Sequence, residues 1–102
     1  MKEYRNKLGQ LHRTDGPAVE YGGGNKEWWI NGKRHRTDGP AVEHSSEYRV
    51  WWINGKCHRE DGPAVEFDNG YKEWWLNGIN YYNEESYNEE IIKLKLKRLT
   101  EL

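Results

Sequence analysis

Residues 51–66 read Trp51-Trp52-Ile53-Asn54-Gly55-Lys56-Cys57-His58-Arg59-Glu60-Asp61-Gly62-Pro63-Ala64-Val65-Glu66. A nearly identical segment precedes these residues in the chain, and parts of it occur again after them. Equivalent positions lie 23 residues apart: His12, His35 and His58; Asp15, Asp38 and Asp61; Pro17, Pro40 and Pro63; and the pairs Trp28-Trp29, Trp51-Trp52 and Trp74-Trp75. A fixed period of this length is typical of a stacked array, in which one unit cannot bury its apolar face alone. The sequence therefore predicts a repeat protein.

Each period contains two turn signals. The tight one is an Asn-Gly pair, found at Asn31-Gly32, Asn54-Gly55 and Asn77-Gly78. Both residues tolerate the positive φ that a two-residue hairpin turn requires, so the flanking segments are predicted to pair as strands. The other turn is predicted around Asp68-Asn69-Gly70 and at the matching places of the earlier periods. Between the turns, Asp-Gly-Pro introduces a kink and Ala-Val-Glu continues as a strand.

The predicted strand register assigns the tryptophans to two faces. With Asn69 and Gly70 as the centre of the wide turn, Val65 lies opposite Trp74. The predicted core face then holds Val19, Tyr21, Trp28, Ile30, Val42, Trp51, Ile53, Val65, Phe67, Trp74 and Leu76. The opposite face holds Trp29, Trp52 and Trp75, with Arg13, Arg36 and Arg59 close enough for cation–π contact and Glu20, Glu43 and Glu66 beside them. A slip of one residue would exchange the two faces. Because Val50 replaces the Glu27 and Glu73 of the other periods, an asymmetry is expected in the middle period.

The pattern stops after Gly78, and a helix is predicted from about residue 84 to residue 100. Asn83 or Ser86 can cap it, and acidic residues precede basic ones in the order that the helix macrodipole favours. Its apolar stripe is predicted to be Ile92, Leu96, Leu99 and Leu102, with Tyr87, Ile91 and Leu94 beside it. We expect it to cover one face or the end of the sheet, and a partner-binding or dimerising helix is the alternative. The chain then forms a single domain: a degenerate first strand (1–8), the repeats (9–82) and the capping helix (83–102).

A family resemblance supports this organisation. The run Trp29-Ile30-Asn31-Gly32-Lys33-Arg34-His35, which returns as Trp52-Ile53-Asn54-Gly55-Lys56-Cys57-His58, is similar to the heart of the MORN repeat. It departs from that family where Arg-x-Asp-Gly-Pro-Ala replaces the usual Gly-x-Gly step after the His, and in this it resembles short repeat proteins of phages and giant viruses. The resemblance implies a row of hairpins that forms one elongated antiparallel sheet. Together with the helix predicted above, the fold class is mainly β, with three 23-residue MORN-like hairpins and a C-terminal α-helix. The resemblance also implies a protein-interaction or scaffold role, and it transfers no catalytic residue.

Composition narrows the function classes. The chain has 102 residues, with 16 Lys and Arg against 17 Asp and Glu, so net charge does not favour a nucleic-acid backbone binder. Cys57 has no partner for an internal disulfide, which favours a reducing, cytoplasmic setting. We expect neither a signal peptide nor a membrane span.

The three equivalent histidines raise the question of a metal or a catalytic site. Equivalent residues of successive hairpins are about 10 Å apart, whereas zinc ligands lie about 2 Å from their ion. An enzyme needs a single group of catalytic side chains. Three equivalent copies of the same His and Asp residues are instead typical of a structural role that is repeated from hairpin to hairpin. We therefore predict no metal, no cofactor and no catalysis, and we interpret these histidines as packing or turn support.

The second tryptophan of each pair is the more informative feature. Trp and Arg are the commonest hot-spot residues of interfaces, and monomers seldom expose a long apolar stripe without a use. The sequence therefore predicts a non-enzymatic protein-interaction module with a binding site at Trp29, Trp52, Trp75, Arg13, Arg36 and Arg59. The resemblance suggests a phage-type inhibitor that occludes a host defence or regulatory protein in the host cytoplasm. Burial of the tryptophan row within the fold, a small anionic ligand such as a nucleotide, a membrane-surface scaffold and a homodimer through the sheet edges are left open.

Overall fold

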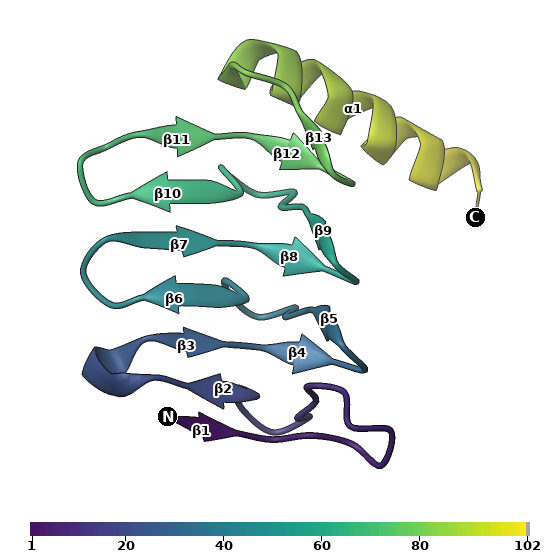
Figure 1. Ribbon diagram of the computed structural model, residues 1–102. Coiled ribbons are helices and arrows are strands. Elements are labelled where there is room, and N and C mark those ends of the chain that lie inside the picture. The colour runs from purple at the N-terminus through teal and green to yellow at the C-terminus, as the bar shows by residue number, and fades with distance from the viewer. Residues whose placement is uncertain (102) are drawn as a thin grey trace.

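The computed structural model describes residues 1–101, which form a large antiparallel sheet followed by one C-terminal helix (Figure 1). The sheet has seven strands in the order β1-β2-β3-β6-β7-β10-β11. Their bounds are β1 Lys2–Glu3, β2 Val19–Glu20, β3 Lys26–Glu27, β6 Val42–His44, β7 Tyr48–Val50, β10 Val65–Phe67 and β11 Lys72–Glu73. A short 3₁₀ turn, Gly22–Gly24, joins β2 to β3. The mainly β fold with a C-terminal helix is as predicted.

Three small hairpins continue the strands of the large sheet beyond a break at the first tryptophan of each pair. They are β4 Trp29–Ile30 with β5 Lys33–Arg34, β8 Trp52–Ile53 with β9 Lys56–Cys57, and β12 Trp75–Leu76 with β13 Ile79–Asn80. In the first, Trp29 pairs with Arg34 across Asn31 and Gly32, whose φ values are 48° and 79°. The predicted register of the tight turns is confirmed, because both turn residues adopt the positive φ of the two-residue hairpin turn.

The wide turn differs from its prediction by one residue. Val65 pairs with Glu73, and the Phe67 amide donates to the Tyr71 carbonyl, so three residues form the loop. Gly70 at its end has a φ of 92°, as in three-residue hairpins that end in a left-handed residue. The predicted pairing of Val65 with Trp74 is wrong. The predicted core face is therefore wrong as well, because a slip of one residue moves a strand's side chains to the other face.

One face of the sheet carries charges that alternate in sign from strand to strand. We call it the charged face, and it consists of Lys2, Glu20, Lys26, Glu43, Arg49, Glu66 and Lys72. Each residue lies directly opposite one of the other sign on the neighbouring strand. Such cross-strand pairs contribute roughly 0.2–1 kcal/mol each. Charged residues of this kind remain hydrated at a surface. Because successive strand residues alternate between faces, the apolar residues of these strands lie on the opposite face of the sheet.

The other face, which we call the valine face, carries three parallel rows. The middle row holds Val19, Glu27, Val42, Val50, Val65 and Glu73, and the row towards the wide turns holds Tyr21, His44, Tyr48, Phe67 and Tyr71. The third row is Trp29, Trp52 and Trp75 on the hairpins. Neighbouring rings of the aromatic row lie 5.0 Å (His44–Tyr48), 5.4 Å (Tyr48–Phe67) and 5.6 Å (Phe67–Tyr71) apart between centroids. The valines therefore share a face with the second tryptophan of each pair, and not with the first.

The helix α1, Glu84–Thr100, has the bounds that the sequence predicts. Asn83 caps it by accepting a hydrogen bond from the Ser86 amide at 2.8 Å. Tyr87 and Ile91 are buried against Leu76, with Trp74 and Tyr81 beside them, so the helix covers the end of the sheet (Figure 1).

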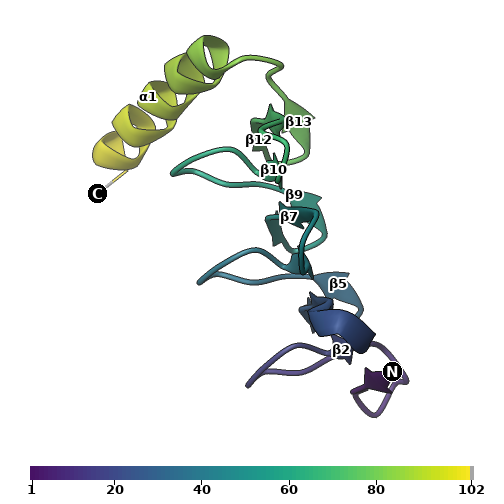
Figure 2. The same cartoon turned by 90° about the vertical axis from the view of Figure 1, so that its left-hand side faces the viewer.

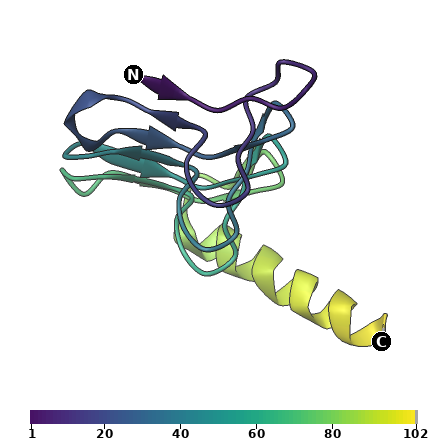
Figure 3. The same ribbon diagram turned by 90° about the horizontal axis from the view of Figure 1, so that it is seen from below.

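The predicted apolar stripe of the helix is wrong in its orientation. Ile92, Leu96 and Leu99 have exposed fractions of 59%, 58% and 66%, and Leu102 lies outside the described residues. The sheet end offers only a narrow apolar surface, and the first turns of the helix occupy it with the face that carries Tyr87, Ile91 and Leu94. The later turns extend past the strands (Figure 3). No helix within residues 1–101 combines the length and the apolar content needed to cross a membrane.

Candidate functional site

The structure separates the tryptophans and arginines that the sequence assigned to one site. Trp29, Trp52 and Trp75 lie half-buried on the valine face. The predicted arginines, in contrast, stack on the first aromatic residue of each period, with centroid distances of 4.0 Å for Arg13 on Tyr4, 3.7 Å for Arg36 on Trp28 and 3.8 Å for Arg59 on Trp51. The expected cation–π contacts with the second tryptophans are therefore wrong for these arginines. Their predicted position beside Glu20, Glu43 and Glu66 is confirmed.

Each of these arginines is engaged by its own loop. The Arg36 guanidinium donates to Asp38 at 3.0 Å, to the Pro40 carbonyl at 3.0 Å and to Glu43 at 3.0 Å. Gly39 packs against the Arg36 guanidinium so closely that a Cβ atom on residue 39 would lie 2.9 Å from the guanidinium carbon. Arg59 makes the same contacts with Asp61, Pro63 and Glu66. These guanidinium groups hold the loops against the sheet, and few of their donors are left for a ligand.

Acidic and aromatic side chains form ordered groups on the valine face at β3 and β11, on either side of the valines of β6, β7 and β10. Glu73 accepts from the Trp75 indole at 2.8 Å and from the Tyr71 hydroxyl at 2.6 Å. Glu27 accepts in the same way from Trp29 at 2.9 Å and from Tyr21 at 2.9 Å. These hydrogen bonds raise the pKa of both tyrosines, because ionisation would place a phenolate beside a carboxylate. Both acids, Glu27 and Glu73, are thus satisfied within the fold.

The middle of the valine face lacks this acid. Val50 occupies the position of Glu27 and Glu73, between Tyr48 and Trp52, and it pairs with Val42 on one side and Val65 on the other. The centre of the face is therefore apolar. This is the asymmetry that the sequence predicted at Val50.

Two different residues separate the tryptophans of the row. The Arg34 guanidinium lies between Trp29 and Trp52, at 4.8 and 5.5 Å from their ring centroids. Cys57 takes the equivalent place beside Trp52 and Trp75, where its side chain is buried. Burial raises the pKa of this thiol to about 12, with a smaller contribution from Glu73, so the thiol stays protonated and packs as an apolar group.

The histidines connect successive hairpins. Nδ1 of His12, His35 and His58 accepts a hydrogen bond from the turn amide of Asn31, Asn54 and Asn77, at 2.9, 3.1 and 2.9 Å. Each imidazole thus fixes the tight turn 19 residues further along the chain, and the predicted turn support is confirmed. Within residues 1–101, no group of three or more His, Cys, Asp or Glu side chains is arranged to hold a metal ion.

The loops that carry Arg13, Arg36 and Arg59 project from one side of the sheet (Figure 2). It is the side of the charged face, because these arginines pair with Glu20, Glu43 and Glu66. Three grooves lie beside these loops. The first, of about 560 Å³, lies between residues 13–16 and 35–38 and includes Trp28 and Ile30. The second, of about 810 Å³, lies between residues 36–39 and 58–61 and includes Trp51 and Ile53. The third, of about 320 Å³, lies between residues 60–63 and α1 and includes Trp74. The helix partly fills this last groove.

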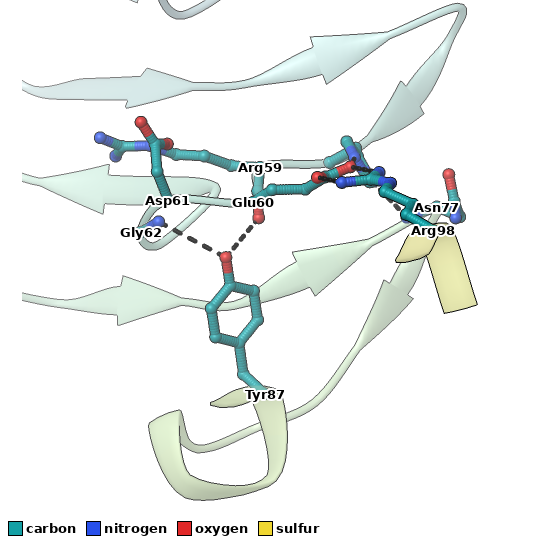
Figure 4. A network of polar contacts seen from close by, with 8 residues as sticks. Arg59, Glu60, Asp61, Gly62, Asn77, Tyr87 and Arg98 are labelled. Atoms are coloured by element: carbon teal, nitrogen blue, oxygen red, sulfur yellow. Dashed lines mark hydrogen bonds and ion pairs between the residues drawn. The ribbon is translucent and has the colours of Figure 1, made fainter. Parts of the chain in front are cut away.

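A polar network attaches α1 to the third groove (Figure 4). The Tyr87 hydroxyl donates to the Arg59 carbonyl at 2.6 Å and accepts from the Gly62 amide at 3.4 Å. Burial raises the pKa of Tyr87, so the phenol remains a donor. Arg98, near the end of the helix, donates twice to Glu60, at 2.6 and 2.7 Å. The sequence did not predict these contacts, since they join residues 25 to 38 positions apart.

The Glu60–Arg98 pair predicts how helix attachment depends on pH. The Arg98 hydrogen bonds, and then that of His58, lower the pKa of Glu60 from 4.5 to about 2. A carboxyl whose pKa is lower in the folded state stabilises the fold above its unfolded pKa and loses this contribution as pH falls through the folded value. We therefore expect the difference in unfolding free energy between wild type and Glu60→Gln to be constant above pH 4.5 and to vanish near pH 2. Chemical denaturation followed by circular dichroism measures it, and a difference that is the same at every pH would contradict the assignment.

Sequence reasoning missed part of the valine face. Arg34 was given no site role, although it lies between two of the predicted tryptophans, and Tyr48 and Phe67 complete the aromatic row beside Val50. Val50 was the available signal, because it is apolar where the equivalent positions are acidic. The binding role of the predicted residues stays a prediction.

No family model, no curated protein and no solved structure matches this chain. Its function is therefore inferred from the surfaces described above.

Proposed function

We propose that this protein is a non-enzymatic interaction module that docks on a protein partner through the centre of the valine face. The observation that supports it is the position of the other elements. The loops and α1 lie on the same side of the sheet, and their contacts are with residues of that side, such as Glu43, Glu66 and Trp74 (Figure 2). Within residues 1–101, no loop or helix lies over the valine face (Figure 2). Val19 and Val65 are buried among their neighbours, but Val42, Val50 and Trp52 stay partly exposed, although sheets usually bury their apolar face.

The composition of this face fits an interface. Its centre is Val42, Val50, Trp52 and the partly exposed Phe67, and the bonded acids Glu27 and Glu73 lie on either side of this centre. Protein interfaces combine an apolar centre rich in aromatic residues with a polar rim. Three of the predicted site residues, Trp29, Trp52 and Trp75, belong to this surface, whereas Arg13, Arg36 and Arg59 support the loops behind it.

The family resemblance supports a more specific version of the proposal. We infer that the chain consists of three MORN-like hairpin units, since equivalent contacts return every 23 residues, as at His12, His35 and His58. In the phage-type proteins that it resembles, an inhibitor would act by covering a surface of a host defence or regulatory protein. The engaged guanidinium groups of Arg36 and Arg59 count against the alternative of a small anionic ligand.

A single substitution tests the docking surface. Val50→Glu introduces the residue that stands at the two equivalent positions, where it accepts from the indole of the following tryptophan and the phenol of a tyrosine. Trp52 and Tyr48 offer the same donors, so we expect the variant to fold. We also expect its carboxylate to weaken partner binding at least tenfold, because docking would bury a charge at the centre of the interface. Affinity capture from host lysate identifies the partner, and titration calorimetry measures both affinities.

The matched control places the same charge outside the valine face and the three grooves. Thr100→Glu adds one carboxylate to the exposed last turn of α1. We expect this variant to bind like wild type. If Val50→Glu binds the captured partner as tightly as Thr100→Glu does, the valine face is not the docking surface.

A further inference from the structure

The docking of α1 shows how a loop of this protein holds a tyrosine. The Tyr87 hydroxyl lies between a carbonyl acceptor and an amide donor of one loop, Arg59 O and Gly62 N. Its ring is buried beside Trp74 and Leu76. Both the polar and the apolar part of the side chain are therefore satisfied, as buried tyrosines require.

The same loop structure occurs twice more without such an occupant. Equivalent to Arg59 and Gly62 are Arg36 with Gly39 and Arg13 with Gly16, and a Cβ on each glycine would lie 2.9 to 3.0 Å from its arginine's guanidinium carbon. These residues line the second and the first groove. Within residues 1–101, the carbonyls of Arg36 and Arg13 and the amides of Gly39 and Gly16 make no hydrogen bond.

The aromatic part of the site is present in a modified form. Trp51 and Ile53 line the second groove, and Trp28 and Ile30 line the first, at the positions equivalent to Trp74 and Leu76. The rings of Trp51 and Trp28 also carry the guanidinium groups of Arg59 and Arg36, which can stack on an aromatic ring as well. Volumes of about 810 and 560 Å³, against about 320 Å³ where α1 is seated, leave room for an aromatic ring. We propose that the first and second grooves each bind a tyrosine side chain of a partner polypeptide, in the manner of Tyr87. This site is separate from the valine face and does not depend on it.

The spacing of the grooves limits the conformation of the partner. Equivalent loops are two strand spacings apart, about 9.5 Å, which is too narrow for a helix about 10 Å across to enter. A polyproline II segment rises about 3.1 Å per residue with three residues per turn, so residues i and i+3 point the same way about 9.3 Å apart. The occupant is therefore an extended segment of the type Tyr-x-x-Tyr, with one ring in each groove.

Nuclear magnetic resonance of the full chain tests this site directly. The probe is the capped peptide Tyr-Pro-Pro-Tyr, and its matched control is Phe-Pro-Pro-Phe, which lacks only the two hydroxyls. We expect saturable shifts of the Gly39 and Gly16 amide resonances and none at Gly62, where Tyr87 is already bound. We expect the phenylalanine peptide to bind about tenfold more weakly, because each groove then leaves a donor and an acceptor unpaired.

Three results would overturn the proposal: no saturable shift at Gly39 or Gly16, a shift confined to Gly62, or equal affinity for the two peptides. Thr14→Arg gives a further check, because residue 14 lines the first groove and not the second. This variant should lose the Gly16 response and keep that of Gly39. The wild-type titration decides the question even if the variant fails to fold.

Discussion

Replacing Arg36 by alanine is expected to lower the free energy of unfolding by about 3 kcal/mol. The side chain is only 20% exposed, stacks 3.7 Å from the Trp28 centroid and donates to three acceptors. A stacked cation contributes roughly 0.5–2 kcal/mol, and hydrogen bonds to charged groups roughly 1.5–3 kcal/mol each. The substitution also leaves Glu43 without its partner. Urea denaturation followed by tryptophan fluorescence measures the loss.

Arg34→Ala is the matched control for this prediction. Arg34 is two residues away and also lies over tryptophan rings, but its side chain is 37% exposed and its ion pair with Glu27 is 3.5 Å long. Glu27, whose side chain is 15% exposed, keeps its hydrogen bonds from Trp29 and Tyr21 when this long contact is removed. We therefore expect Arg34→Ala to cost about 1 kcal/mol, less than Arg36→Ala. Equal losses of unfolding free energy for the two variants would contradict the structural role that we assign to Arg36. Arg36 would then again be a candidate binding residue.

Ala41→Leu is expected to destabilise the protein by a similar amount, about 3 kcal/mol. Ala41 has no exposed surface, and its carbonyl accepts from the Trp28 amide at 2.7 Å. Ala18 and Ala64 are equally inaccessible at the equivalent positions. Three additional carbon atoms must displace the strand or the tryptophan, and overpacking of this kind commonly costs 1–3 kcal/mol, occasionally more. Thermal unfolding by calorimetry measures the change.

The neighbouring residue gives the control for Ala41. Val42 is half-buried on the valine face, so Val42→Leu adds one methylene at a surface with space above it. We expect a change below about 1 kcal/mol. If Ala41→Leu is tolerated as well as Val42→Leu, the strands are less tightly packed at Ala41 than the structure indicates.

Part of the candidate site could be predicted from the sequence. Trp29, Trp52 and Trp75 were chosen because adjacent strand residues point to opposite faces, and they do form one row. Their predicted neighbours are wrong, because the wide turn has three central residues and the prediction has two. Asp68-Asn69-Gly70 is compatible with both lengths, and the difference of one residue exchanges the partners of Val65.

The role of the arginines could not be derived from the sequence. Spacing places Arg36 near Asp38 and Glu43, and those contacts form. The Arg36 guanidinium stacks on Trp28 and not on Trp29. This choice depends on the path by which residues 36–41 fold back over the sheet. The same folding back creates the grooves, which involve loops 23 residues apart in the chain.

The sequence by itself determined the Asn-Gly turns, the alternation of the strands and the bounds of α1, because these depend on φ preferences, on the two-residue period and on capping within a few residues. Only the tertiary structure decided which tryptophan of each pair faces the valines and which helix face is buried. Which tryptophan faces the valines depends on the wide turn having three residues. Which helix face is buried depends on the narrow end of the sheet, where Tyr87 and Ile91 pack. Local preferences are nearly the same for the alternatives in both cases, and contacts between residues distant in the chain select one of them.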